Sequence, residues 1–441
     1  MNIKLRLFLI SIFINCACYN SQSRKLIISN VKILDHSTSS LTKPKNILIT
    51  DGVITKIDDQ KITAEPGTVL INGKGRSLIP GLIDVHVHMV FGALTMSELT
   101  SKDFSEIGMM KSVAESSQKM LLRGFTSVRD AGGPIFPLKD AIDNGKIIGP
   151  RIWPSGATIS QTGGHGDFRT PDERSRRFFG KISRAEQLGA TFIADGRDDV
   201  LTATRENLRF GASQIKLMAG GGTSSAYDPI DVTQYTLDEM KAAVDAADDW
   251  GTYVMVHAYT PKAVRRAVEA GVRCIEHGQL LDEPTLKLLA DKGVWLSLQN
   301  LMDNNDNMDE SRKKKRKGIL EGQDLVWPMA KRLGVKLAWG RDFLFEPELN
   351  DQQNDYILRL AKWFNNAEIL KMLTKDNAEL LQMSGLRSPY PGKLGVIEEG
   401  ALGDVILVDG DPLKDITLLS DPEKRFILIV KNGVIYKNLV K

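Results

Sequence analysis

The sequence is poor in cysteine and in net charge. Of its three cysteines, Cys16 and Cys18 lie near the N-terminus and only Cys274 lies in the body of the chain. No disulfide can therefore form within the body, which excludes a small scaffold held together by disulfides. The net charge of +3 is too small to favour a nucleic acid or another strongly charged partner. The content of 42% hydrophobic residues is ordinary for a globular protein.

One basic run, residues 313–317, stands out from this balanced charge. Acidic residues flank the run at Asp309, Glu310 and Glu321. We therefore interpret it as the solvent-exposed face of a helix or loop, and we expect no nucleic-acid partner.

Beyond the N-terminus, the sequence has no apolar run long enough to span a membrane. At the N-terminus, two basic residues precede a short apolar stretch, residues 7–14, and small or polar residues follow it. This pattern is typical of an export signal. We expect residues 1–20 to be a signal peptide and the protein to be secreted or periplasmic. Contact with a membrane is expected only if the chain is lipidated at Cys18 or Cys16.

Both ends of the chain are rich in short stretches with strand character. The turn signals Asp51-Gly52 and Asn432-Gly433 separate some of them. The predicted strands are 25–33, 46–50, 53–57, 68–72, 404–408, 425–431 and 434–436. We expect the two ends, residues 21–79 and 391–441, to combine in one small β-sandwich domain.

The middle of the chain, residues 80–390, alternates apolar strands with helical stretches such as Leu237–Asp249 and Pro261–Ala270. The apolar runs are 78–88, 125–130, 151–156, 214–218, 252–257, 272–277, 294–298 and 335–340. Eight such units in this length predict an α/β protein with a (β/α)8 TIM-like barrel. In that fold the chemistry lies at the C-terminal ends of the strands.

Candidate metal ligands gather at those predicted strand ends. His86 and His88 are two residues apart on a strand, so both side chains point to the same face. Imidazole and carboxylate groups are common metal ligands, and core histidines would explain one or two of these positions but not the whole set. The chain has six histidines, and the strand ends carry His86, His88, Lys216, His257, His277 and Asp342.

Lys216 is an unusual member of this set. Four imidazoles and one carboxylate exceed the three protein ligands of a typical catalytic zinc, so two metal ions with a bridging ligand are plausible. Strand alternation turns Lys216 into the barrel, where an unpaired ammonium is costly and repels cations. A lysine carbamylated by carbon dioxide would be an anionic oxygen ligand. A salt bridge to a barrel carboxylate is the alternative that the sequence leaves open.

Over nearly its whole length the chain resembles the amidohydrolase superfamily. Within it, the chain is most similar to imidazolonepropionase-like amidohydrolases and to prolidase-like Xaa-Pro or Xaa-Arg dipeptidases. The stretches that carry this likeness are 84–88, 129–133, 163–167, 216–222, 257–260, 275–278, Asp342 and 395–404.

The resemblance implies two divalent metal ions. Zinc is the first candidate, although these ligands also suit manganese, iron or cobalt. It also implies that Lys216 is N6-carboxylated and bridges the two ions. One ion would bind His86, His88 and Asp342, and the other would bind His257 and His277.

Three residues are implied as catalytic. Asp342 would take a proton from a metal-bridging hydroxide and pass it to the leaving amine. Tyr259 and His165 would bind the substrate carbonyl or carboxylate, although a packed tyrosine at the barrel rim and a histidine that stabilises a loop are equal alternatives.

Arg341 departs from the family pattern. It is expected to point away from Asp342 and pair with a carboxylate, or, if it reaches the pocket, to recognise a substrate carboxylate.

The sequence thus predicts a metal-dependent hydrolase of amide or peptide bonds. The preferred function is that of a dipeptidase or N-acyl amino acid hydrolase that releases a C-terminal amino acid. The alternatives are a cyclic-amide hydrolase or deaminase, and a non-catalytic binding protein, against which the intact ligand set argues. The partner is a small-molecule or dipeptide substrate, and a homo-oligomer remains open. Segments 159–190 and 299–325 are candidate lids, and the Gly-rich run 219–223 is expected to approach the metal or substrate closely.

Overall fold

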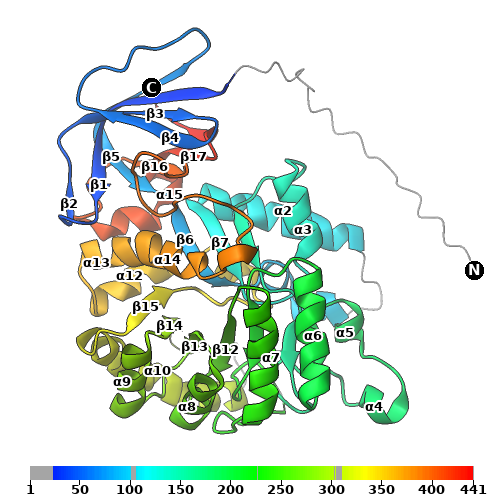
Figure 1. The fold of residues 1–441 in the computed structure, drawn as a ribbon. Coiled ribbons are helices and arrows are strands. Elements are labelled where there is room, and N and C mark those ends of the chain that lie inside the picture. Colours follow the sequence, from blue (N-terminus) through cyan, green and yellow to red (C-terminus); the bar gives the residue numbers. More distant parts are fainter. Residues whose placement is uncertain (1–22, 101–105, 226, 302, 304–309, 441) are drawn as a thin grey trace, which may run out of the picture.

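The computed structural model describes residues 23–440 except 101–105, 226, 302 and 304–309. A β-rich part lies above a larger α/β part in Figure 1. The predicted signal peptide, with Cys16 and Cys18, lies outside the described residues. Among the described residues, no helix is both long and apolar enough to cross a membrane.

Both ends of the chain form the β-rich part, as predicted. Its strands are β1 (Lys25–Asp35), β2 (Ser40–Leu41), β3 (Lys45–Thr50), β4 (Val53–Asp58), β5 (Val69–Pro80), β16 (Val405–Val408), β17 (Phe426–Lys431) and β18 (Val434–Asn438). They form one sheet in the order β18-β17-β16-β5-β1-β3-β4, with β2 paired to β1, rather than the two sheets of a sandwich. Val53 at one edge of this sheet pairs with Leu402 beside β16, which shows that the sheet curls. Its buried side chains, including Ile28, Ile47 and Leu428, form a core of their own.

One predicted strand is divided between the two parts of the molecule. The apolar run that leads to His88 was predicted as a single strand, but β5 ends at Pro80 and pairs with β16, whereas β6 (Leu82–Val87) begins the α/β part. Gly81 lies at the break. A Cβ atom there would lie 2.0 Å from the Thr126 hydroxyl, so only glycine fits without displacing β7.

All eight predicted apolar runs of the middle segment contain parallel strands. Strands β6, β7 (Phe125–Asp130) and β8 (Arg151–Pro154) form one sheet. The second sheet has the order β10-β9-β11-β12-β13-β14-β15. Its strands are β9 (Thr158–Ser160), β10 (Thr191–Ile193), β11 (Ile215–Met218), β12 (Val254–Ala258), β13 (Cys274–His277), β14 (Trp295–Leu298) and β15 (Lys336–Trp339). The short strands β9 and β10 were not predicted.

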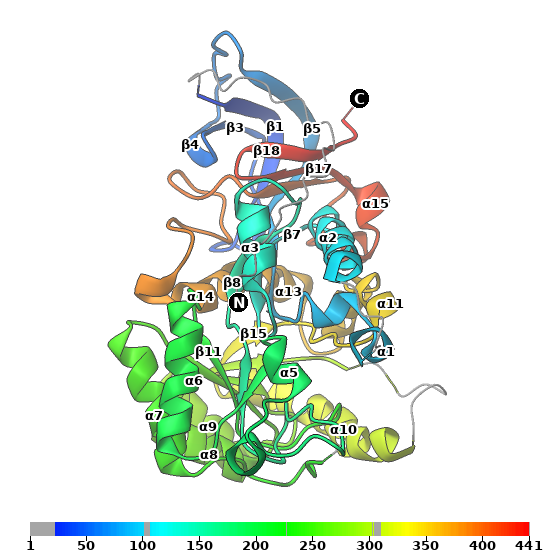
Figure 2. The same cartoon turned by 90° about the vertical axis from the view of Figure 1, so that its right-hand side faces the viewer.

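Helices cover the outside of these sheets, as Figure 2 shows for α6 and α7 beside β11. The predicted helices 237–249 and 261–270 are confirmed as α7 and α8. The side chains of Thr236 and Thr260 cap their first turns.

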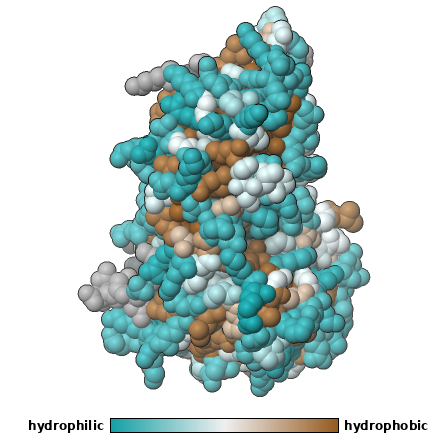
Figure 3. All heavy atoms as spheres, turned by 90° about the vertical axis from the view of Figure 1, so that its left-hand side faces the viewer, coloured by the Kyte–Doolittle hydropathy of each residue, from teal (hydrophilic) through white to brown (hydrophobic). Residues whose placement is uncertain are grey.

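The face of the molecule in Figure 3 is largely hydrophilic, with hydrophobic residues set among hydrophilic ones. The helices are α1 (Met96–Thr100), α2 (Glu106–Leu122), α3 (Phe136–Asp143), α4 (Arg176–Phe179), α5 (Arg184–Gln187), α6 (Arg197–Arg209), α7 (Leu237–Asp249), α8 (Pro261–Ala270), α9 (Glu283–Lys292), α10 (Glu310–Arg332), α11 (Pro347–Asn350), α12 (Asp355–Leu358), α13 (Asn366–Lys371), α14 (Asn377–Gln382) and α15 (Pro422–Arg425).

Hydrogen bonds outside the strand ladders connect the two parallel sheets. Between β8 and β11, the Ser213 amide donates to the carbonyl of Pro154 at 2.7 Å. Between β15 and β6, the Asp342 amide donates to the carbonyl of His86 at 2.7 Å. Asn377, at the start of α14, completes this second junction.

The Asn377 side chain is fully buried and makes three hydrogen bonds to backbone groups. Its amide nitrogen donates to the carbonyls of Ile83 and Trp339, and its oxygen accepts from the Trp339 amide. A buried group left without its partner costs about 1–3 kcal/mol, so we expect Asn377→Ala to lower the free energy of unfolding by roughly 3 kcal/mol. Urea denaturation measures this change.

The matched control is Asn144→Ala, which removes one hydrogen bond from an exposed asparagine to the Asp140 carbonyl. It should change stability by no more than about 0.5 kcal/mol. Equal effects of the two substitutions would contradict a joining role for Asn377.

Candidate active site

Strand ends from both parallel sheets meet in one small pocket, with a cavity volume of about 30 Å³. Apolar side chains such as Phe91, Phe168 and Leu344 form part of its wall. Every residue that the sequence singled out for the site lines this pocket: His86, His88, His165, Lys216, His257, Tyr259, His277 and Asp342. The structure therefore brings the whole predicted set together.

His86, near the end of β6, is held through both ring nitrogens. Its Nδ1 lies 2.6 Å from Oε2 of Glu276, so the Nδ1–H group donates to this carboxylate. Its Nε2 faces Lys216 Nζ and Asp342 Oδ1, each 3.3 Å away. Burial and Lys216 lower the pKa of His86, but Asp342 and Glu276 outweigh them and raise it. With Nδ1 tied to Glu276, Nε2 is the ring nitrogen that would bind a metal ion.

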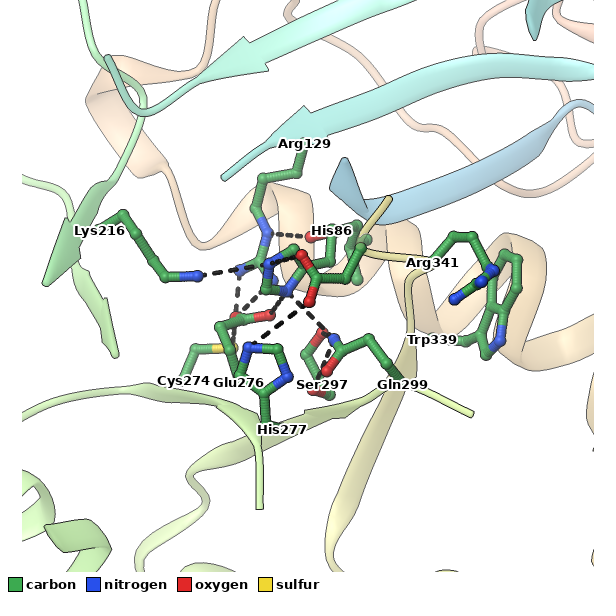
Figure 4. A network of polar contacts seen from close by, with 12 residues as sticks. His86, Arg129, Lys216, Cys274, Glu276, His277, Ser297, Gln299, Trp339 and Arg341 are labelled. Atoms are coloured by element: carbon green, nitrogen blue, oxygen red, sulfur yellow. Dashed lines mark hydrogen bonds and ion pairs between the residues drawn. The ribbon is translucent and has the colours of Figure 1, made fainter. Parts of the chain in front are cut away.

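Glu276 belongs to a buried charged network around His86 (Figure 4). Its Oε1 accepts hydrogen bonds from Arg129 Nη2 at 2.6 Å and from Cys274 Sγ at 3.0 Å. Arg129 also donates to the Tyr253 hydroxyl. Burial by itself raises the pKa of Glu276, but Arg129 and His86 outweigh it and hold that pKa well below its usual range. The carboxylate therefore stays ionised and orients His86.

His88 follows β6 and is oriented in the same way. Its Nδ1 donates to the carbonyl of Gly132 at 2.8 Å, which leaves Nε2 facing Asp342 Oδ1 at 3.3 Å. The loop that carries Gly132 is fixed in turn by Asp130, whose carboxylate accepts from the amides of Met89 and Gly132. The histidine ring is thus set before any ligand binds.

Lys216 is buried, with 1% of its surface exposed. Burial lowers the pKa of its ammonium group. Its Nζ lies 3.3 Å from His86 Nε2, and no carboxylate oxygen within the described part of the chain lies within 4.0 Å of it. The salt bridge that the sequence left open is therefore not formed among these residues.

Asp342 and His277 have unusual backbone conformations at the strand ends. Their φ angles are +58° and +79°, a region that residues other than glycine seldom occupy and that is often found at functional sites. One ligand atom each from His86, His277 and Asp342 lies within 4.8 Å of the other two. Burial keeps the pKa of His277 well below its usual range, which favours the neutral imidazole. This trio is suited to hold a divalent metal ion.

Three aromatic rings continue the site on the side of β12. His257 Nε2 lies 3.0 Å from the carbonyl of Gly221 and donates to it, so its Nδ1 carries the lone pair. The His257 ring centroid lies 4.3 Å from that of His277 and 4.0 Å from that of His165. Burial, together with these two neighbours, keeps the pKa of His257 well below its usual range. Tyr259 packs beside His277, with ring centroids 5.1 Å apart.

The Gly-rich run 219–223 lies against the loop that carries His165. A Cβ atom on Gly222 would lie 2.0 Å from Cε1 of His165, so glycine makes room for this ring. His165 Nδ1 is held 2.6 Å from the Ser225 hydroxyl and 3.4 Å from a carboxylate oxygen of Asp228. Gly222 thus approaches His165 closely, and Thr223 of the same run lines the pocket, while the expected approach to a metal or substrate stays a prediction.

Arg341 points away from the pocket, as strand alternation predicted, and has no dashed contact to the residues drawn in Figure 4. The expected partner, a carboxylate, is not found among the described residues. Instead the guanidinium lies between the rings of Phe343 and Tyr356, 3.4 and 3.1 Å from their centroids. Burial lowers its pKa to about 9. In this position Arg341 does not line the pocket.

A larger outer pocket, of about 560 Å³, adjoins the site and shares Thr223, Ser224 and Leu344 with it. Three charged side chains line it: Arg312, Lys315 and Glu346. Lys315 donates to the carbonyls of Gly222, Ser225 and Asp228, and Arg316 is buried. The interpretation of 313–317 as a solvent-exposed face is therefore wrong for these two residues.

Comparison with known proteins agrees with this geometry. The model of the family described as "Amidohydrolase family" matches residues 77–436. The chain belongs to the amidohydrolase family. The predicted resemblance is thus confirmed, and the family assignment makes the protein a hydrolase.

Individual relatives place this amidohydrolase near a prolidase-like group. Ochratoxinase of Aspergillus niger is 28% identical over 377 residues, which cover 82% of this chain and 75% of the relative. The crystal structure of a prolidase complexed with N-methylphosphonate-L-proline is 33% identical, with a TM-score of 0.85, and the match covers 94% of this chain and 100% of that one. A Xaa-Pro dipeptidase with bound methionine is 27% identical, with a TM-score of 0.79 and the same coverage.

Sequence reasoning did not find the Arg129–Glu276 pair that supports the site of this amidohydrolase. Both residues lie within stretches that carried the family likeness, next to Asp130 and His277. A charged residue at an inward-facing position of an apolar strand was the available signal, because burial of such a group requires a partner.

The contact between Gly222 and His165 gives a test of the site in this amidohydrolase. Gly222→Ala should displace the His165 ring, and misplacement by about 1 Å can cost roughly 100-fold in turnover. We expect kcat/KM on an amide substrate to fall by about this factor while the metal content stays unchanged.

Gly220→Ala is the matched control, because the nearest atom to its Cβ would lie 3.5 Å away, an ordinary contact. It should leave kcat/KM nearly unchanged. If Gly222→Ala behaved like this control, the position of His165 would not matter for the reaction.

Proposed function

We propose that this chain hydrolyses an amide bond with the help of two divalent metal ions and releases a C-terminal amino acid from a dipeptide or N-acyl amino acid. The observation that carries the proposal is the meeting of the six candidate ligands in one buried pocket: His86, His88, Lys216, His257, His277 and Asp342. Prolidase, Xaa-Pro dipeptidase and ochratoxinase among its relatives support it. The protein is expected to be exported.

The donor set of the pocket fits divalent ions. His86 and His88 have one ring nitrogen tied to a protein oxygen and the other facing Asp342. Together these three would hold one ion, zinc being the first candidate, and His257 and His277 would hold the second. Bound ions would polarise the scissile carbonyl and make water a better nucleophile.

Lys216 would bridge the two ions in its N6-carboxylated form. An ammonium group at this position lies against the His86 ring, which would have to accept a cation, and no described carboxylate oxygen lies within 4.0 Å of it. Loss of one proton from the ammonium group gives the neutral amine. Addition of carbon dioxide to the amine, with loss of a second proton from its nitrogen, would then place a carbamate anion where the buried cation was. The lowered pKa of Lys216 favours the neutral amine that such an addition needs.

Three side chains would act on the substrate. Asp342 faces the ligand histidines and would hold the proton that must reach the leaving amine. Tyr259 and His165 line the pocket and would orient the substrate carbonyl. His165 is suited to this because its Nδ1 is already bound to Ser225, which leaves Nε2 for the substrate.

The outer pocket suits a substrate that carries both charges of a dipeptide. Arg312 and Glu346 line it and are paired with each other at 2.7 Å. A dipeptide would exchange this pair, with its carboxylate on Arg312 and its ammonium group on Glu346. Lys315 would add only its charge, because it already donates to three backbone carbonyls.

We also propose that the two parallel sheets are parts of one closed (β/α)8 barrel, with β6–β8 and β11–β15 as its eight strands and the short β9 and β10 as additions. Support comes from the hydrogen bonds at both junctions and from the ion pair of Arg129 on β7 with Glu276 on β13, which crosses from one sheet to the other. A closed barrel would place all strand ends around a single pocket.

Product analysis tests the proposed reaction. The purified, metal-supplemented protein is incubated with a panel of dipeptides, N-acyl amino acids and a lactam, and free amino acids and ammonia are both quantified. We expect a C-terminal amino acid without ammonia. Asp342→Asn, assayed in parallel, should show no turnover.

Ammonia as the product, or opening of the lactam ring with no dipeptide cleaved, would instead establish the deaminase or cyclic-amide alternative. A protein that binds panel members without turnover would be a non-catalytic binding protein and would overturn the proposal.

A further inference from the structure

A short basic segment, residues 174–184, projects from the α/β part and is called the tip below. It contains α4, which lies at the lower right edge of Figure 1, away from both sheets. Three large apolar side chains of the tip face solvent: Phe178 is 80% exposed, Phe179 58% and Ile182 46%. Phe178 has the highest exposure among the exposed large apolar residues of the described chain.

Basic residues surround these apolar side chains. The tip has no acidic residue and carries five cations: Arg174, Arg176, Arg177, Lys181 and Arg184. The two carboxylates near Arg176, on Glu186 and Asp199, are each 3.9 Å away. Within the described residues, Arg177 and Lys181 have no carboxylate within 4.0 Å. The charges of Arg177 and Lys181 are therefore not compensated by a described carboxylate.

The base of the tip is firmly held, so its apolar apex does not result from a loose loop. The carboxylate of Glu173 accepts from the amides of Thr170 and Arg184, which closes the loop at its base. Gly180, with a φ of +74°, ends α4, and Ser183 forms a capping box that starts α5. This framework holds Phe178 and Phe179 outward.

We propose that the tip docks on an anionic lipid bilayer, with its apolar apex at the boundary between headgroups and acyl chains and its cations among the headgroups. Apolar side chains rimmed by lysine and arginine match the polarity profile of this boundary. A nucleic acid would use the cations but would leave the three apolar side chains exposed. The proposal goes beyond the expectation that membrane contact requires a lipid on Cys16 or Cys18, and it does not depend on the proposed reaction.

Binding of the full chain to sedimented vesicles tests the proposal. Vesicles of phosphatidylcholine alone are compared with vesicles containing phosphatidylglycerol. We expect partitioning onto the anionic vesicles to be at least tenfold stronger and to weaken with added salt. Each cation near an anionic surface contributes roughly a fivefold factor, so the double variant Arg177→Gln/Lys181→Gln should bind about 25-fold more weakly. Phe178→Ser/Phe179→Ser should also lose binding.

Matched controls remove the same groups elsewhere on the surface. Lys314→Gln/Lys317→Gln removes two exposed cations of α10, and Phe210→Ser removes an exposed phenylalanine beside α6. Neither control should change partitioning more than about twofold, since neither site combines exposed apolar groups with uncompensated charge. Residues 1–22 are the same in every variant, so their own contribution to vesicle binding cancels.

A tryptophan placed at the apex reports on the tip alone. The emission of Phe178→Trp should shift to shorter wavelength with anionic vesicles, whereas that of Phe210→Trp should not. The proposal is overturned if Phe178→Trp shows no shift or if the tip variants bind like the parent chain. It is equally overturned if sedimentation velocity without vesicles shows that the tip joins copies of the chain to one another.

Discussion

The ion pair between Arg129 and Glu276 is the interaction on which the rest of the site depends. Both side chains are fully buried, and a buried charge without its partner is strongly destabilising. Arg129 also donates to the carbonyl of Val85, so the pair fixes β6, β7 and β13 relative to one another. The second oxygen of Glu276 binds Nδ1 of His86 and orients its ring. One interaction therefore both stabilises the fold at this point and fixes the position of the ligand His86.

This support comes with a conflict at the neighbouring position. Lys216 lies beside the ligand nitrogen of His86. An ammonium group there is unfavourable because it is buried, and it would also repel a metal ion. Carboxylation of Lys216 would remove both the buried ammonium charge and its repulsion of a metal ion, because the lysine would become a ligand. His277 and Asp342 adopt the left-handed backbone conformation, which is strained for residues other than glycine. This strain is consistent with a backbone that directs these two ligands toward the same place as the others.

Periodicity and turn signals in the sequence predicted the strands of the α/β part other than β9 and β10, the helices at 237–249 and 261–270, and six of the residues that line the pocket. Tyr259 and His165 were predicted from the family resemblance. These features depend on local patterns and on the rule that parallel strands end at one edge. The break at Gly81, the aromatic contacts of Arg341 and the role of Gly222 could not be predicted in this way. Each depends on a residue distant in sequence: Thr126, Tyr356 and His165 respectively. The signal peptide and the metal ions remain predictions.

Metal binding with and without bicarbonate tests the central claim most directly. The metal-free protein, freed of carbon dioxide, is titrated with zinc in the presence and absence of bicarbonate, and bound metal is counted after gel filtration. The account predicts two tightly bound ions per chain only with bicarbonate, and their loss in Lys216→Met under either condition. Two tightly bound ions without bicarbonate, or in Lys216→Met, would contradict the claim that a carboxylated Lys216 completes the site.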